Sequence, residues 1–195
     1  MERGQAEALM PMIETVVTES GAGVAGIDLL AVTIGPGGFT GLRIGIAAAR
    51  GLMLATGLPL VGVTSFAAIA AAVPSPRRAG LPLAIALERT RAEIYLQCFA
   101  ADGPALADGT LVDPADAAAL LPPGPMLLAG DAAARLQPFL GGRARLLAEI
   151  VFPDPADIAA LAAAQWRPGE RPAAPLPLYL RAPDTTQPRR GKVLQ

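Results

Sequence analysis

The stretch GPGGFTGLRIG, residues 35–45, decides how the first third of the chain is interpreted. An apolar run, residues 29–34, precedes it and predicts a short buried strand. An alanine-rich run follows it and predicts a helix over residues 39–56. Glycine permits a tight turn between the two, and Thr40 is placed to cap the helix start. Strand, glycine loop and helix in this order often form a phosphate site.

The loop lacks the residues that two well-known nucleotide loops require. A P-loop needs a lysine after its last glycine, whereas Leu42 follows Gly41. A dinucleotide fingerprint needs a third glycine where this chain has Thr40, and an acidic ribose partner about 20 positions later. Residues 52–60 contain no acidic side chain. The candidates that remain for holding a simple anion are Gly37, Gly38, Thr40 and Arg43.

Small residues also form a stripe along the predicted helix. Gly41, Gly45 and Ala49 are four apart and therefore share one face. A glycine inside a helix costs about 1 kcal/mol relative to alanine, so two on one stripe indicate that another backbone packs closely there. That backbone belongs either to this chain or to another subunit, and the sequence leaves both possibilities open.

Composition excludes several classes of function. The 195 residues are 52% hydrophobic and 17% charged, which is enough apolar material for a sizeable core. The formal charge is −1, so there is no basic excess to hold a nucleic-acid backbone alone. The basic cluster at residues 189–192 is expected to be a solvated terminus.

The chain contains no histidine and one cysteine. A Ser-His-Asp triad, a Cys-His pair and a histidine-based zinc site are therefore impossible within it, and we expect no metal and no cofactor. Cys98 cannot form an internal disulfide, and its apolar surroundings predict a buried, inert thiol. With a charged start unlike a signal peptide and no apolar segment suited to a membrane, these features predict a cytoplasmic protein.

The first third of the chain reads as helix, strand, helix, strand, helix, which is typical of an α/β layer. The predicted elements are a helix over 2–18, a strand over 29–34, a helix over 39–56, a strand over 60–63 and a helix over 66–72 capped by Ser65. Residues 74–80 are the best candidate linker. Beyond it we predict strands at 83–87, 93–99, 126–129 and 145–148, and helices at 114–120, 131–139 and 155–166, the last capped by Asp154.

Two short strands are too few to cover three apolar helices, so the chain is expected to start partway into a domain. The predicted division is an N-terminal lobe over residues 1–76, a second lobe over 77–182 and a flexible tail over 183–195. Within the proline-rich end, only residues 178–180 are expected to be ordered.

Three stretches, residues 2–9, 35–45 and 57–63, closely resemble the TsaB (YeaZ) family. TsaB is a bacterial subunit of the machinery that makes threonylcarbamoyladenosine in tRNA. Looser similarity at residues 91–95, 129–132 and 175–181 extends the resemblance over nearly the whole chain, in the order of the family.

The resemblance implies an actin-like (ribonuclease-H-like) α/β fold of two lobes, whose first lobe lacks its N-terminal strands. It also implies a non-catalytic scaffold that pairs with TsaD through its first two helices. TsaE would join that pair, tRNA would be contacted only indirectly, and the chain alone could form a homodimer. The implied partner-binding residues are Arg3, Gly4, Gln5, Glu7, Leu9, Met10, Ile13, Phe39, Thr40, Gly41, Leu42, Arg43, Gly45, Ala48 and Ala49.

The chain departs from the family pattern in places. Gln5 stands where the family has histidine, and residues 88–90 replace its usual Asp-Ala-Arg. The His-x3-His metal pair of TsaD-type relatives is missing, in line with a non-catalytic role. The alternative is a phosphotransferase or ATPase of the actin and sugar-kinase superfamily, for which Asp28 and Asp131 are the candidate catalytic residues.

Overall fold

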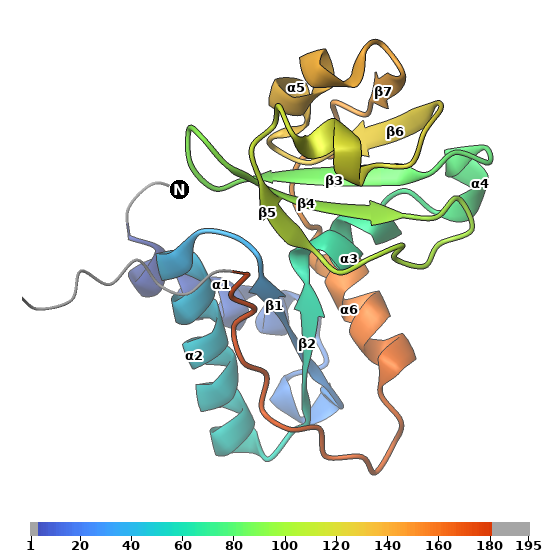
Figure 1. Cartoon of the computed structure of the whole chain (residues 1–195). Helices are drawn as coiled ribbons and strands as arrows, with labels where there is room; N and C mark the ends of the chain where they lie inside the picture. The colour runs from blue at the N-terminus through green and yellow to red at the C-terminus, as the bar shows by residue number, and fades with distance from the viewer. Residues whose placement is uncertain (1–3, 181–195) are drawn as a thin grey trace, which may run out of the picture.

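The computed structural model describes residues 4–180, which form two lobes (Figure 1). The first lobe opens the chain and contains a parallel pair of strands with helices around it. Its elements are α1 (Gln5–Glu19), the 3-10 turn η1 (Val24–Gly26), β1 (Leu30–Gly35), α2 (Phe39–Thr56), β2 (Leu60–Thr64) and α3 (Ser65–Ala71).

The second lobe is built on a five-stranded sheet. Its elements are α4 (Ser75–Arg78), β3 (Leu83–Glu88), β4 (Ile94–Phe99), β5 (Thr110–Val112), η2 (Ala117–Leu120), β6 (Met126–Ala129), α5 (Ala133–Leu136), η3 (Gln137–Leu140) and β7 (Ala144–Leu146). The strand order is β5-β4-β3-β6-β7. β3 and β4 form an antiparallel hairpin, whereas β6 and β7 run parallel to β3 and extend the sheet on its other side.

The core of the second lobe follows the two-residue period of β3. Leu83, Ile85 and Leu87 face one cluster, in which they meet α3, and Ala84 and Ala86 face the other. Because both faces are covered, five consecutive residues of β3 are buried. A run that is apolar at every position is expected for such a strand.

The first lobe has the undersized sheet that the sequence predicts. β1 runs parallel to β2, with Leu30 opposite Leu60, and it pairs with no other strand among residues 4–180. β2 is mostly buried, whereas Gly35 is the one buried residue of β1. The helices of this lobe therefore have little sheet beneath them.

The last part of the chain returns to the first lobe (Figure 1). In α6 (Pro155–Gln165), Ala162 packs with Val61 and Val63 of β2 and Ala68 of α3. Residues 174–180, here called the strap, then run back along β1 and α2: the Leu178 amide donates to the Ile34 carbonyl at 2.7 Å. The predicted second lobe, residues 77–182, includes α6 and the strap. In the structure both pack on the first lobe, where α6 supplies the apolar face that covers β1 and β2.

Several local predictions need correction. Thr64, not Ser65, caps α3, because its hydroxyl accepts from the Ala67 amide at 3.0 Å. Gly38, not Thr40, is the N-cap of α2, and no side chain caps that helix. The predicted helix over 114–120 is reduced to η2, and the one over 131–139 is divided into α5 and η3. The cap on α6 is confirmed, since the Asp154 carboxylate accepts from the Ala156 amide at 2.7 Å.

The predicted linker at 74–80 contains α4 and a buried arginine. Arg78 is 3% exposed and donates to the carbonyls of Val73, Ala100 and Ala70 at 2.7, 2.5 and 3.1 Å. Burial lowers the pKa of its guanidinium, and the nearby Asp102 opposes that shift. Arg78 therefore joins the end of α3 to the end of β4, so this segment fixes the lobes together instead of separating them.

Cys98 is buried, as predicted, and burial raises the pKa of its thiol. The thiol is therefore neutral near pH 7 and has the inert character expected of a core cysteine. Among residues 4–180, no helix is both long enough and apolar enough to cross a membrane.

Candidate partner-binding surface

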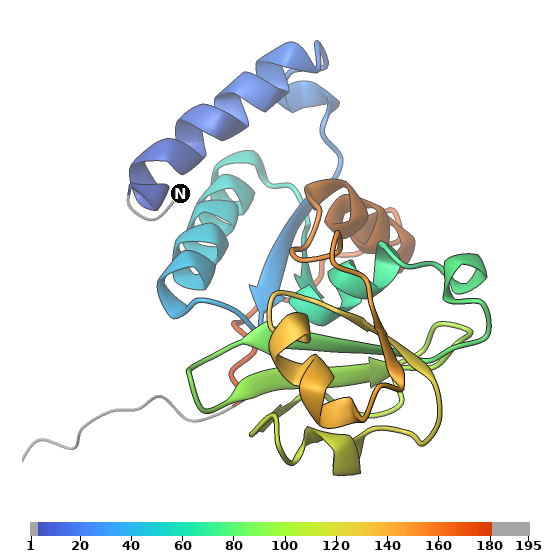
Figure 2. The ribbon, with the colours of Figure 1, turned by 90° about the horizontal axis from the view of Figure 1, so that it is seen from above.

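α1 lies on the outer side of α2, apart from the rest of the molecule (Figure 2). None of its residues is buried, and Met10, Met12 and Val16 are 47%, 53% and 65% exposed. Pro11 lies inside the helix, where it lacks the amide that would donate to the Glu7 carbonyl. The described residues thus leave much of the apolar surface of α1 exposed.

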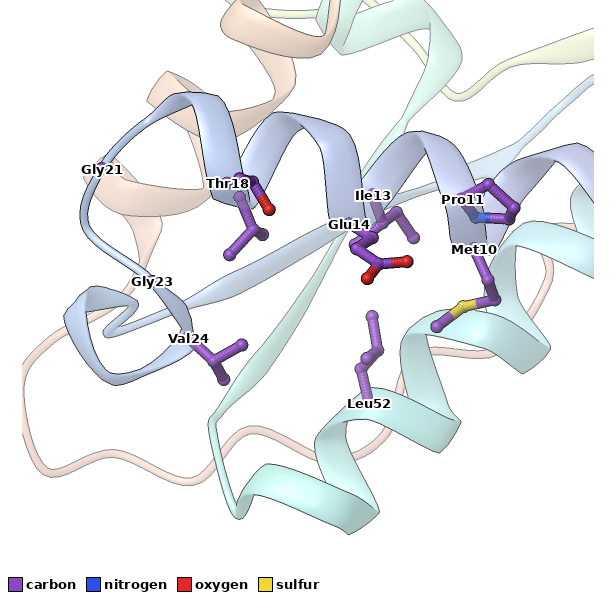
Figure 3. Close-up of a pocket in the computed structure, with 10 residues that line it drawn as sticks. Met10, Pro11, Ile13, Glu14, Thr18, Gly21, Gly23, Val24 and Leu52 are labelled. Carbon is purple, nitrogen blue, oxygen red and sulfur yellow. The ribbon is translucent and has the colours of Figure 1, made fainter.

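A groove of about 730 Å³ separates α1 from α2. Figure 3 shows Leu52 of α2 pointing toward α1, with Met10 and Glu14 reaching into the gap and Val24 closing one end. The lining is mostly apolar: Met10, Pro11, Ile13, Glu14, Val17, Thr18, Gly21, Gly23, Val24 and Leu52. The groove between the two helices is therefore a mostly apolar surface.

A cluster of three side chains stands at the start of α2. The Arg43 guanidinium lies over the Phe39 ring, 3.7 Å from its centroid, and its Nε donates to the Tyr179 hydroxyl at 3.2 Å. The two rings are 5.8 Å apart, and each residue is nearly half exposed. Tyr179 comes from the strap, so the cluster joins positions that are 136 residues apart.

The strap is held to α2 at a second point. Arg50 donates from Nη2 to the carbonyls of Ala174 and Pro175, at 3.5 and 3.0 Å. Gly62 of β2 is necessary there, because a Cβ at this position would lie 2.7 Å from Pro175 and 2.6 Å from Ile34. The strap therefore covers the face of β1 and β2 that α6 leaves open.

The four anion candidates lie together at the turn into α2. Gly37 and Gly38 precede the helix, Thr40 is exposed in its first turn, and Arg43 turns toward Tyr179 instead of the loop amides. The Leu42 amide already donates to the Gly38 carbonyl at 3.0 Å. An anion at this turn stays a prediction.

The small residues of the stripe do not all face the same element: Gly41 faces α1, and Gly45 faces β1. A Cβ on Gly41 would lie 3.4 Å from the Gln5 side chain of α1, whereas one on Gly45 would lie 4.0 Å from Val32 of β1. Gly45 therefore packs inward against the sheet, and of the two possibilities left open, internal packing explains it. Gly41 lies between the helices, at the edge of the exposed surface.

The other predicted partner residues include some that are exposed and some that are half-buried. Gly4, Gln5, Glu7, Met10, Phe39, Thr40 and Arg43 are exposed, while Leu9, Ile13, Leu42, Ala48 and Ala49 are half-buried. Arg3 lies outside the described residues. The same surface also holds Met12, Val16 and Leu52 of the two helices, and Tyr179, which only the fold brings near.

One of the two candidate catalytic carboxylates, Asp131, has a structural role. The Asp131 carboxylate accepts from the Glu88 amide at 2.8 Å and so fixes the end of β3. Beside it, Arg135 pairs with Glu88 at 2.6 Å and donates to the Thr90 and Glu93 carbonyls, which holds the β3–β4 hairpin. Asp28 is exposed before β1. Within residues 4–180, no three His, Cys, Asp or Glu side chains are grouped to hold a metal ion.

Comparison with known proteins specifies the family of this chain. The family model described as "TsaD: tRNA N6-adenosine threonylcarbamoyltransferase" matches residues 1–164, and the chain belongs to this family.

Within it, the chain stands with the TsaB (YeaZ) proteins, and its fold is the predicted actin-like one. It is 41% identical over 68 residues to the tRNA threonylcarbamoyladenosine biosynthesis protein TsaB of Escherichia coli, covering 35% of this chain and 29% of that protein. The solved structure of YeaZ from Pseudomonas aeruginosa matches with a TM-score of 0.76 and 27% identity, over 90% of this chain and 85% of that one. An uncharacterized Mycobacterium tuberculosis protein is 35% identical over 184 residues, 93% of this chain and 77% of that protein.

Proposed function

We propose that this chain takes part in making threonylcarbamoyladenosine in tRNA, as a non-catalytic subunit that pairs with TsaD through α1 and α2. The E. coli relative carries that biosynthetic role in its name. The observation that carries the pairing is the state of α1, a 15-residue helix with no buried residue and with Met10, Met12 and Val16 exposed.

The non-catalytic role is supported by the residues that are missing or otherwise engaged. The whole chain has no histidine, and its one lysine is Lys192. Asp131 was a candidate catalytic residue of the alternative, a phosphotransferase. Its carboxylate accepts a hydrogen bond from the Glu88 amide and so has a structural role. As part of the same proposal, TsaE joins the pair, tRNA is contacted indirectly, the complex is cytoplasmic, and the chain alone self-associates through the same apolar surface.

The test is binding to TsaD of the same organism, measured by calorimetry with the Met10→Asp variant. A charge placed in the groove should weaken the complex by a factor of ten or more, which corresponds to about 1.4 kcal/mol or above. Leu106→Asp is the matched control, because Leu106 is 54% exposed and lies in the second lobe. Equal binding by Met10→Asp and the wild type would show that α1 is not the contact.

The alternative has its own test in the isolated chain. ATP hydrolysis that is lost on Asp131→Asn would contradict the non-catalytic role. The asparagine keeps an oxygen that accepts from the Glu88 amide, so the hairpin stays in place while the carboxylate is removed. We expect no hydrolysis by either form.

A further inference from the structure

Arg43 differs from the other arginine that holds the strap. Arg50, seven residues further along α2, directs Nη2 inward to two backbone carbonyls. Arg43 uses Nε for the Tyr179 hydroxyl and rests on Phe39, and its Nη atoms have no hydrogen bond to the described residues. The outer edge of its guanidinium therefore has two donors left to offer.

Within residues 4–180, Arg43 also has no ion-pair partner. No aspartate or glutamate occurs in the sequence between Asp28 and Glu88, a stretch that includes the whole of α2. The described ion pairs join Arg77 to Glu149 and Arg135 to Glu88, both in other parts of the molecule. At the start of α2, a cation thus stands without an ion pair to any carboxylate in the part of the chain that the structure describes.

The cluster holds this cation in one orientation. Stacking on Phe39 fixes the plane of the guanidinium, and the Tyr179 hydroxyl fixes its rotation. An arginine fixed in this way loses less conformational freedom when it binds, and exposed Tyr, Phe and Arg are residue types that concentrate binding energy at interfaces.

We propose that Phe39, Arg43 and Tyr179 form the receptor for a carboxylate side chain of the protein partner that covers α1 and α2. This deepens the proposed function and rests on it. The carboxylate would accept from the two Nη groups in the paired geometry that arginine favours. Tyr179 thereby makes the strap part of the binding surface, beside the two helices.

A protein carboxylate suits the site better than an RNA phosphate. Binding to a nucleic-acid backbone draws on several cations, and Arg43 is the one arginine or lysine in the described part of α1 and the first turns of α2. One face of the Phe39 ring is already occupied by the guanidinium, which removes a stacking surface for a base. The site also lies close to α1, because a Cβ on Gly41, two residues before Arg43, would be 3.4 Å from the Gln5 side chain.

The experiment measures TsaD affinity and its dependence on salt for three variants. Arg43→Gln should weaken binding about tenfold and flatten the salt dependence, because one charge pair is lost. Tyr179→Phe keeps the ring but loses the hydroxyl, and should weaken binding about threefold. Arg77→Gln, which removes a charge elsewhere on the surface, should leave both quantities unchanged, and thermal melts confirm that each variant is folded.

The outcomes separate the two proposals. If the wild type binds TsaD and Arg43→Gln binds it equally well, the carboxylate receptor is wrong while the pairing stands. If the wild type does not bind TsaD, both are wrong. If the chain alone binds tRNA and Arg43→Gln abolishes this, the site takes phosphate and the carboxylate assignment is overturned. Recovery of Arg43→Glu binding by a single Asp-to-Lys or Glu-to-Lys change in TsaD would identify the paired residue.

Discussion

β1 and β3 are both apolar strands of six residues, yet they are covered very differently. β3 is central in a five-stranded sheet and has five buried residues, because neighbours and two clusters surround it. β1 has a single strand neighbour among residues 4–180, and Gly35 is its one buried residue. The sheet of the second lobe is thus covered on both faces, on one of them by α3 of the first lobe, whereas five of the six residues of β1 are only partly buried.

The largest expected change in the free energy of unfolding comes from removing a core side chain of the second lobe. Leu128→Ala should lower the free energy of unfolding by about 3 kcal/mol, because Leu128 is fully buried in β6 and a cavity would remain. Ile13→Ala in α1, where the side chain is half-buried, should lower it by about 1 kcal/mol or less. Urea unfolding followed by circular dichroism gives both values. Equal losses would mean that α1 is as well packed as the sheet.

The next effect concerns the junction between the lobes. Arg78→Met should lower the free energy of unfolding by about 2–3 kcal/mol, because the carbonyls of Ala70, Val73 and Ala100 would lose a charged donor in a buried place. Arg77→Met, at an exposed position beside it, is the control and should change stability by about 0.5 kcal/mol or less. Similar melting temperatures for the two variants would show that the buried arginine does not join the lobes.

The smallest expected change in the free energy of unfolding comes from substitutions of Gly45. They test whether this residue packs against β1 or faces a partner. Gly45→Leu should lower the free energy of unfolding by about 1.5 kcal/mol, because the new side chain would meet Val32 of β1. Gly45→Ala should leave stability equal or raise it by up to about 1 kcal/mol, since its Cβ would be at ordinary contact distance. If Gly45→Leu is as stable as the wild type but fails to bind TsaD, Gly45 faces the partner after all.

The sequence predicted most elements because their patterns are local. The apolar run before residue 35, the alanine-rich run after it and the Asp154 cap each lie within a few residues. What the sequence could not place depends on contacts between distant segments. From its sequence, the apolar side of α6 could pack on the sheet of either lobe. Only the fold shows that Ala162 packs against Val61 and Val63 of the first lobe.

The residues of the candidate surface likewise fall into those that the sequence indicated and those that only the fold brings together. The family resemblance was enough to indicate Met10, Ile13 and Phe39 as candidates, but a stripe of small residues cannot show which neighbour it faces. Gly45 was therefore interpreted as a possible subunit contact, although Val32 lies beneath it. Tyr179 had no local signal, because its hydrogen bond reaches Arg43 across 136 positions.

The return of α6 and the strap to β1 and β2 sets the order in which the chain can mature on the ribosome. β1 and β2 are synthesised early, whereas Ala162 follows Val63 by 99 residues and Leu178 follows Ile34 by 144. The sheet between Leu83 and Leu146 has all its strands before then. All five strands of the second lobe are therefore made before the segments that cover β1 and β2.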